Sequence, residues 1–360
     1  MKVFITGFLS LVFFQVSLSQ NLAAYYDYRS YFYVFDNGAN QQAEYLPVKS
    51  YKVGGNAVAY VDNSDNFKVF YAGKSYPLAD VAPTAYSATD DLVVYNIDKL
   101  LSVFDNGTAT KMPGWATSFV SGDSIVGYFD DNGGLYKVYY GGVVNPLPDV
   151  IDDNSISTFI AGDNLLAYFN ADGNFRAFFH NKVYDLGTNH VSKYQAGSST
   201  IAFMDEYSQT FKVFYNGVVA TMENQPPKSM QCGDDLIAYI DATGSFKIFY
   251  KGSLITVMTY EPGFYSTVDN VVAFGTDNVD FNVFYKGNVY KLETNTPVNY
   301  QLDYNSVAYI DPYGYLKLFS DGKTKQVTSL KITDYTLTKN VLMYKTAMFD
   351  YHFYLNGTEY

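Results

Sequence analysis

The stretch FKVFYAGKSYPL (residues 67–78) decides the fold, because close copies of it return along the chain. The pattern reads FKVFYNGVVATM from Phe211, FKIFYKGSLITV from Phe246 and FNVFYKGNVYKL from Phe281. In each copy a dipeptide ending in glycine joins two strand-like segments, which is typical of a tight β-hairpin. The repetition indicates that one supersecondary unit is used many times in this protein.

An aromatic residue in the segment before each copy gives the length of the unit. It ends the tetrad AVAY (residues 57–60) and recurs in steps of 33 to 40 residues, most of them 35. A fixed period in this range is typical of solenoids, propellers and arrays. The aromatic positions mark ten units that leave no room for a linker, namely Tyr25, Tyr60, Tyr95, Tyr128, Tyr168, Phe203, Tyr239, Phe274, Tyr309 and Tyr344.

Each unit divides into four short segments, here called a to d, as in residues 191–197 for a, 58–62 for b, 67–71 for c and 74–78 for d. Ten of the eleven prolines lie in segment d or between d and the next a, the exception being Pro312. Because proline removes a ladder donor, d is expected at a sheet edge and the stretch from d to a as a crossover.

Segment c is apolar on both faces of its pleat, so it must be covered on both sides. A four-stranded antiparallel sheet between two similar sheets satisfies this requirement, and such a sheet is a propeller blade. The sequence therefore predicts an all-β protein, a β-propeller of about ten four-stranded 35-residue repeats. An open curved stack of β units stays as the alternative, because Asn21 aligns with Asn56 at the start of segment b and strand exchange between the termini is not evident.

The chain resembles the β-propeller repeat proteins of exported bacterial type, loosely the WD-repeat, TolB-like and tectonin-like groups. The resemblance covers residues 21–360 and rests on the pattern Asn-x-Val-Ala-Tyr-x-Asp followed by Phe-Lys-Val-Phe-Tyr-x-Gly. The Trp-Asp dipeptide of WD repeats is absent, so no specific family is identified. Ten blades exceed the four to eight that are typical.

Composition agrees with an all-β chain and excludes some partners. Aromatic residues make up 18% of the sequence, and 30 of the 36 acidic residues are Asp, a turn residue, rather than Glu, a helix former. The net charge of −12 argues against nucleic acid and anionic membranes as partners. A single cysteine excludes an intramolecular disulfide.

The N-terminus has the layout of a secretory signal peptide. Lys2 precedes an apolar run from Val3 to about Val16, and the small residues Ser17 and Ser19 follow. We expect residues 1–19 to be the signal peptide and residues 20–360 to form one repeat domain. The run is too short for a membrane anchor, and no other stretch reaches spanning length. A periplasmic, outer-membrane-associated or secreted protein is predicted.

The charged residues of the repeat have structural explanations. Asp-rich strings between b and c, such as DNSDN (62–66), faintly resemble calcium loops, but Asp, Asn and Gly are also what a tight turn requires. In five units a lysine in segment c faces an aspartate that ends segment b, which predicts a cross-strand ion pair. In the sixth unit the expected partner of Arg176 is Asn170.

A few residues depart from the repeat and are candidates for function. Trp115 lies near the start of an a segment, His180 replaces a turn residue after c, and His190 lies in a crossover. The longest unit is the clearest irregularity and supplies a candidate binding loop, with Asp149, Asp152, Asp153, Asn154 and Asp163. The three histidines lack ligand spacing, so no zinc site is expected.

The sequence favours a non-catalytic binding or scaffold module for an extracytoplasmic protein or glycan, because variation is free only in the turns and crossovers. No catalytic residue and no cofactor or metal site is assigned. The alternative is a hydrolase of extracellular glycans that uses loop carboxylates such as Asp152, Asp153 and Asp163. Convergence of several loop carboxylates on a deep central pocket would favour that alternative.

Overall fold

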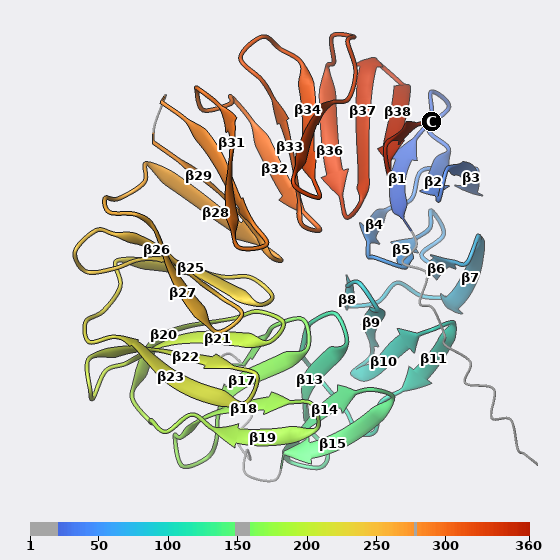
Figure 1. Cartoon of the computed structure of the whole chain (residues 1–360). Helices are drawn as coiled ribbons and strands as arrows, with labels where there is room; N and C mark the ends of the chain where they lie inside the picture. Colours follow the sequence, from blue (N-terminus) through green and yellow to red (C-terminus); the bar gives the residue numbers. More distant parts are fainter. Residues whose placement is uncertain (1–20, 148–158, 277–278) are drawn as a thin grey trace, which may run out of the picture.

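The computed structural model describes residues 21–147, 159–276 and 279–360. They form ten antiparallel sheets, blades 1–10 in chain order, arranged in a ring around a central axis (Figure 1). No described residue is helical, and hence no described segment forms a helix long and apolar enough to span a membrane. The prediction of an all-β propeller with ten repeats is confirmed.

The strands of blades 1–5 are β1 (Leu22–Tyr26), β2 (Phe32–Asp36) and β3 (Ala39–Glu44); β4 (Ser50–Val53), β5 (Ala57–Val61), β6 (Phe67–Tyr71) and β7 (Lys74–Ala79); β8 (Ala85–Ala88), β9 (Leu92–Ile97), β10 (Leu100–Asp105) and β11 (Thr108–Lys111); β12 (Phe119–Ser121), β13 (Ile125–Asp130), β14 (Leu135–Tyr140) and β15 (Val143–Leu147); β16 (Ile160–Ala161), β17 (Leu165–Phe169), β18 (Phe175–Phe179) and β19 (Lys182–Asp185).

Those of blades 6–10 are β20 (Val191–Ala196), β21 (Thr200–Asp205), β22 (Thr210–Tyr215) and β23 (Val218–Glu223); β24 (Ser229–Cys232), β25 (Leu236–Ile240), β26 (Phe246–Tyr250) and β27 (Ser253–Met258); β28 (Phe264–Val268), β29 (Val271–Gly275), β30 (Phe281–Tyr285) and β31 (Asn288–Glu293); β32 (Tyr300–Asp303), β33 (Ser306–Ile310), β34 (Leu316–Ser320) and β35 (Lys323–Gln326); β36 (Asp334–Thr338), β37 (Val341–Ala347), β38 (Asp350–Leu355) and β39 (Thr358–Glu359).

Each four-stranded blade runs a-b-c-d from the axis outward, as in β24-β25-β26-β27. The inner strands of successive blades contact one another, for example β24 with β28 and β28 with β32, whereas outer strands such as β11 and β35 are exposed along their length. The prediction of d as an edge strand is therefore confirmed. Blade 1 has three strands in the described residues, and its β1 occupies the place of segment b.

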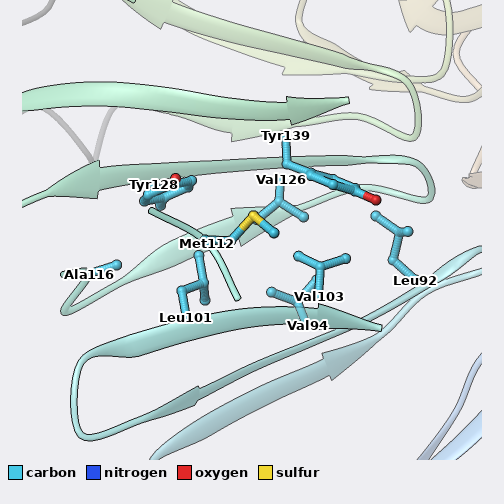
Figure 2. Packing of buried hydrophobic residues seen from close by; sticks show 9 residues of the cluster. All are labelled: Leu92, Val94, Leu101, Val103, Met112, Ala116, Val126, Tyr128 and Tyr139. Atoms are coloured by element: carbon cyan, nitrogen blue, oxygen red, sulfur yellow. The ribbon is translucent and has the colours of Figure 1, made fainter. Parts of the chain in front are cut away.

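The core lies between neighbouring blades rather than inside any one of them. In β6 the predicted covering of both faces is found, since Phe67, Val69 and Phe70 are all buried. Figure 2 shows the arrangement between blades 3 and 4, where Val94 and Val103 of one blade meet Val126 and Tyr139 of the next. A single blade could not bury these side chains alone, so each blade depends on its neighbours for stability.

The ring closes, and the open stack is wrong for this chain. Blade 1 packs against blade 10, where the rings of Phe35 and Phe353 stack at 4.3 Å and the Asn340 amide donates to Asn21 Oδ1 at 2.9 Å. In the described residues no strand of one terminus joins the sheet of the other. Closure therefore rests on side-chain packing and polar contacts between the two terminal blades. In Figure 1 strand β1 lies beside strands β37 and β38.

The five predicted lysine–aspartate pairs of the b–c hairpins are all present, at 2.6–3.0 Å between Nζ and Oδ2. In three of them the lysine also binds a glutamate of the preceding blade at 2.7 Å, as Lys247 does with Glu223. The partner predicted for Arg176 is wrong: its guanidinium lies 3.6 Å from Asp185 of strand β19. Arg176 and Asp185 are direct cross-strand neighbours, which local spacing between b and c did not reveal.

The Asp-rich strings between b and c serve the turns. Asp62 Oδ1 accepts the backbone N–H groups of Ser64 and Asn66 at 2.8 and 2.9 Å, and Asp241 accepts those of Thr243 and Ser245 in the same way. Burial alone would raise the pKa of Asp62, but these bonds and the Lys68 ammonium lower it to about 2. The same carboxylate thus closes the turn and binds the lysine.

Candidate functional site

The two faces of the ring are chemically different. Because successive strands alternate in direction, the a–b and c–d turns lie on one face, here called the turn face. The b–c turns and the d–a crossovers lie on the opposite face, here called the crossover face. Each face is built from two loops of most blades, so it can present many side chains around the axis.

Carboxylates converge around the axis on the turn face. They occupy the a–b turns or the end of the a strand in six blades and form the carboxylate ring: Asp90, Asp123, Asp163, Asp234, Asp269 and Asp303. Lys339 of blade 10 enters this ring, and its Nζ lies 2.5 Å from Asp90 Oδ1 of blade 3 and 3.8 Å from Asp303 Oδ1 of blade 9. One lysine therefore links blades on both sides of the closure between blades 10 and 1.

The environment of the carboxylate ring disfavours its full ionisation. Burial, helped by the charges of Asp163 and Asp90, raises the pKa of Asp123 to about 7. Burial and the charge of Asp303 raise the pKa of Asp269 to about 6. Burial and a hydrogen bond with Asp163 raise the pKa of Asp234. At neutral pH some of these carboxyl groups therefore carry protons.

The pairing of Lys339 with its aspartates outweighs its own burial. Burial alone would lower the pKa of Lys339, but the contact with Asp90 and the charges of Asp303 and Asp123 raise it. The ammonium also lowers the pKa values of Asp123 and Asp269 relative to what burial would set. Lys339 is thus the cation that compensates this concentration of negative charge.

Polar contacts between successive a–b turns hold the carboxylate ring in place. The backbone N–H of Asp235 donates to Asn270 Oδ1, and that of Asn270 donates to Asn305 Oδ1, both at 2.9 Å. Ser199 Oγ donates to Asp235 Oδ1 at 2.5 Å in the preceding step. These contacts form a belt between blades, so many polar groups of the turn face already have structural partners.

Glycine sets the spacing of that belt. A Cβ atom on Gly162 would lie 1.8 Å from the carbonyl oxygen of Gly197, and one on Gly197 would lie 1.7 Å from that of Gly233. Both distances are far below van der Waals contact, so only glycine allows these turns to approach so closely. The carboxylates next to the glycines are brought together by the same approach.

The crossover face carries exposed apolar side chains instead. Of the large apolar residues that are exposed in the described turns and crossovers, Tyr304 alone lies on the turn face. Seven lie in b–c turns, namely Tyr28, Tyr207, Val279, Tyr313, Tyr315, Met348 and Phe349. Another seven lie in or at the start of crossovers, namely Tyr45, Leu46, Val81, Trp115, Tyr260, Val298 and Leu330.

The structure separates the residues that the sequence singled out. Trp115 and His190 lie on the crossover face, where Trp115 is 52% exposed and His190 lies 6.4 Å from the ring of Tyr207. His180 lies in a c–d turn, stacked on Phe179 at 3.9 Å, and Asp163 belongs to the carboxylate ring. Asp149, Asp152, Asp153 and Asn154 lie outside the described residues.

Sequence reasoning missed the carboxylate ring as a unit, although a periodic signal was present. The residue five positions before the repeat aromatic is aspartate in five blades and lysine in blade 10. Four surface cavities of the described residues, of 270–830 Å³, have none of these carboxylates in their lining. Among the described residues no three His, Cys, Asp or Glu side chains are arranged to hold a metal ion.

Comparison with known proteins gives a family match. The sequence model of the family described as "10-bladed beta propeller domain" matches residues 16–360. No curated protein matches the sequence.

Solved structures to which the chain is similar have low identity. A crystal structure of the eukaryotic initiation factor shares 11% identity at a TM-score of 0.43, with 78% of this chain and 90% of that chain covered. BamB from Moraxella catarrhalis shares 11% sequence identity at a TM-score of 0.32, with 77% of this chain and 95% of that chain covered. The CRINKLY WD40 ectodomain of the Arabidopsis thaliana receptor kinase ACR4 shares 9% sequence identity at a TM-score of 0.33, with 68% of this chain and 97% of that chain covered. At these TM-scores the likenesses support no statement about function.

Proposed function

The chain belongs to the 10-bladed beta propeller domain family, and from this premise we propose that it is a non-catalytic binding module that recognises a protein through its crossover face. Propellers present loops from many blades on one face, which suits broad recognition at several points. The partner is an extracytoplasmic protein, because the N-terminus predicts export.

The unequal distribution of exposed apolar side chains supports this proposal. Tyr207 and Tyr313 are 88% and 85% exposed, and Val298 is 97% exposed, all on the crossover face. The enrichment of exposed apolar side chains on one face suits an interaction surface, and tyrosine is a frequent energetic anchor in protein interfaces. The turn face offers mainly polar groups that are already bonded to one another.

Replacing Tyr207, Tyr313 and Met348 together by serine is expected to reduce partner capture at least tenfold. The unfolding midpoint should not change, because these side chains are exposed and contribute little to the core. The measurement is a pull-down from the native envelope or medium, quantified by mass spectrometry, with a glycan array in parallel. The matched control replaces Leu254, Val218 and Val289 of the outer strands, also exposed, by serine and should capture the partner normally.

Equal capture by both triple variants would contradict the use of the crossover face. If the protein binds to the glycan array and captures no protein, the partner is a glycan and the proposed partner class is wrong. A hydrolase is the second candidate, favoured by the carboxylate ring, whose members have unequal tendencies to ionise. Turnover of a polysaccharide that is abolished by Asp163→Asn would overturn the non-catalytic proposal.

Export is the second part of the proposal and rests on the sequence of residues 1–19, which lie outside the described residues. The exported protein is expected to begin at Gln20, because small residues at Ser17 and Ser19 suit signal peptidase cleavage. N-terminal sequencing of the protein from the medium or the envelope measures this. An exported chain that still begins at Met1 would refute the cleavage.

A further inference from the structure

One repeat position changes its chemistry in blade 7. The a-strand residue opposite the repeat aromatic of strand b is itself aromatic in the other four-stranded blades, as in Tyr86 opposite Tyr95 and Tyr265 opposite Phe274. In blade 7 this residue is Met230, opposite Tyr239. The aligned residues elsewhere are Tyr51, Tyr86, Phe119, Phe159, Tyr194, Tyr265, Tyr300 and Tyr335.

The aromatic residue has a defined packing role that methionine does not reproduce. At five junctions among the described residues its ring contacts the phenylalanine that begins strand c in the preceding blade, as in Phe67 with Tyr86 and Phe246 with Tyr265, both at 5.1 Å between ring centroids. At the junction of blades 6 and 7 the corresponding pair is Phe211 and Met230. A thioether chain is narrower and more flexible than a phenol ring, so it fills this place less completely.

A cavity of 540 Å³ lies at this exception. Its apolar lining includes Ile160, Tyr194, Met204 and Met230, and the crossover prolines Pro226 and Pro227 border it. The volume lies within the range of sites that bind small molecules or single side chains of a partner. Because the crossover 226–228 forms one wall, the cavity belongs to the crossover face of blades 6 and 7.

The rim of the cavity is not acidic, unlike the chain as a whole. The lining contains the two lysines Lys193 and Lys228 against the single acid Glu206, in a protein of net charge −12. Lys228 Nζ is paired with Glu261 at 2.7 Å, and Glu206 is bonded to Ser192 and Gln209. Among the described residues no carboxylate lies within 4.0 Å of the Lys193 ammonium, although hydrogen bonds from Ser192 and Gln209 and, to a smaller extent, the charge of Lys193 lower the pKa of Glu206. A ligand with a carboxylate near Lys193 would complement this rim.

We propose that this cavity is an anchor site for the partner protein and takes an aromatic side chain that is next to an acidic residue. The proposal rests on the proposed function and names the chemistry of the segment that the partner inserts. The aromatic side chain occupies the space that the repeat fills with its own ring in the other blades. The neighbouring carboxylate meets Lys193.

The test uses a defined probe, the dipeptide N-acetyl-Asp-Phe-amide, and the methyl signal of Met204 in ¹³C-methionine NMR spectra of the full protein. The wild-type protein should bind this probe with a Kd of roughly 1 mM, as expected for a ligand of this size. N-acetyl-Lys-Phe-amide and N-acetyl-Asp-Ala-amide should each bind at least threefold more weakly. Equal binding of all three probes would overturn the proposal.

The decisive variant is Met230→Tyr, which restores the residue type of the repeat. It should fold normally and weaken binding of N-acetyl-Asp-Phe-amide at least tenfold, because the ring fills the cavity. Tyr265→Met is the matched control, one blade away, and should leave the Met204 shifts unchanged. Lys193→Glu, an exposed position, should weaken binding at least threefold and keeps the test valid should Met230→Tyr fail to fold.

Unchanged binding of the probe by a folded Met230→Tyr variant, or by Lys193→Glu, would refute the anchor site. The outcome is independent of the proposed function, since the dipeptide experiment needs no natural partner. A partner that is captured equally by the crossover-face triple variant would refute the function and leave the anchor site standing. A partner lost by that variant but captured equally by Met230→Tyr would refute the anchor site alone.

Discussion

Replacing Lys339 by methionine is expected to lower the free energy of unfolding at pH 7 by about 3 kcal/mol or more. The change removes the cation that lies 2.5 Å from Asp90 and 3.8 Å from Asp303, and it leaves partly buried carboxylates without compensation. It also removes a link across the closure between blades 10 and 1. Urea unfolding followed by tyrosine fluorescence measures the loss.

Two controls separate the burial of Lys339 from the loss of any lysine. The side chain of Lys251 is 55% exposed, and its ammonium lies 3.7 Å from Asp235. The substitution Lys251→Met should therefore lower the free energy of unfolding by less than about 1 kcal/mol. The double variant Asp90→Asn, Lys339→Met should recover part of the loss, because it removes a charge together with its partner. A Lys339→Met variant as stable as Lys251→Met would contradict the compensating role.

The same cluster predicts how stability changes with pH. Asp123 and Asp269 have folded-state pKa values of about 7 and about 6, raised from the ordinary value of 3.8. Between pH 3.8 and these raised values, the folded protein therefore binds more protons than the unfolded chain. Their contribution to stability is complete below about pH 4 and is lost as the pH rises through about 6 to 7. Without Lys339, which lowers both pKa values, the loss should extend to higher pH.

Carboxylates of the hairpin turns act in the opposite direction. Asp62 has a pKa lowered to about 2, so its contribution is complete above about pH 4 and is lost as the pH falls toward 2. The two groups together predict maximal stability near a mildly acidic pH of about 4 to 5. Unfolding midpoints measured from pH 3 to pH 9 test this, and stability that rises steadily toward pH 9 would contradict it.

The substitution Gly197→Ala is expected to cost about 3 kcal/mol or to prevent folding, because its Cβ would lie 1.7 Å from the carbonyl oxygen of Gly233. Relief would require the a–b turns of blades 6 and 7 to move apart and break the polar belt. Differential scanning calorimetry and the yield of folded protein measure the effect.

Gly173→Ala is the matched control for this close approach. Its site has open space and a φ of +77°, so it carries only backbone strain of about 1 kcal/mol. A Gly197→Ala variant no less stable than Gly173→Ala would show that the turns can separate without loss.

Local patterns in the sequence determined the repeat, the strands and the hairpin contacts. The 35-residue period placed the strands, because strand b, the turn and strand c are neighbours in the chain. Five lysine–aspartate pairs followed from the same local register. The prediction failed for Arg176, because the residue opposite it on strand b is Tyr168, whereas the residue opposite it on strand d is the carboxylate Asp185.

Relations between distant blades were decided only by the tertiary structure. Closure of the ring depends on the tilt summed over all blades, and a repeat pattern does not contain that tilt. The carboxylate ring follows from closure, because Asp90 and Lys339 are 249 residues apart and meet only when blades 3 and 10 face the same axis. The sequence contains one sign of the cavity at Met230, namely a methionine at a repeat position that is otherwise aromatic. The size of the cavity depends on how two blades pack against each other, and only the folded ring determines that packing.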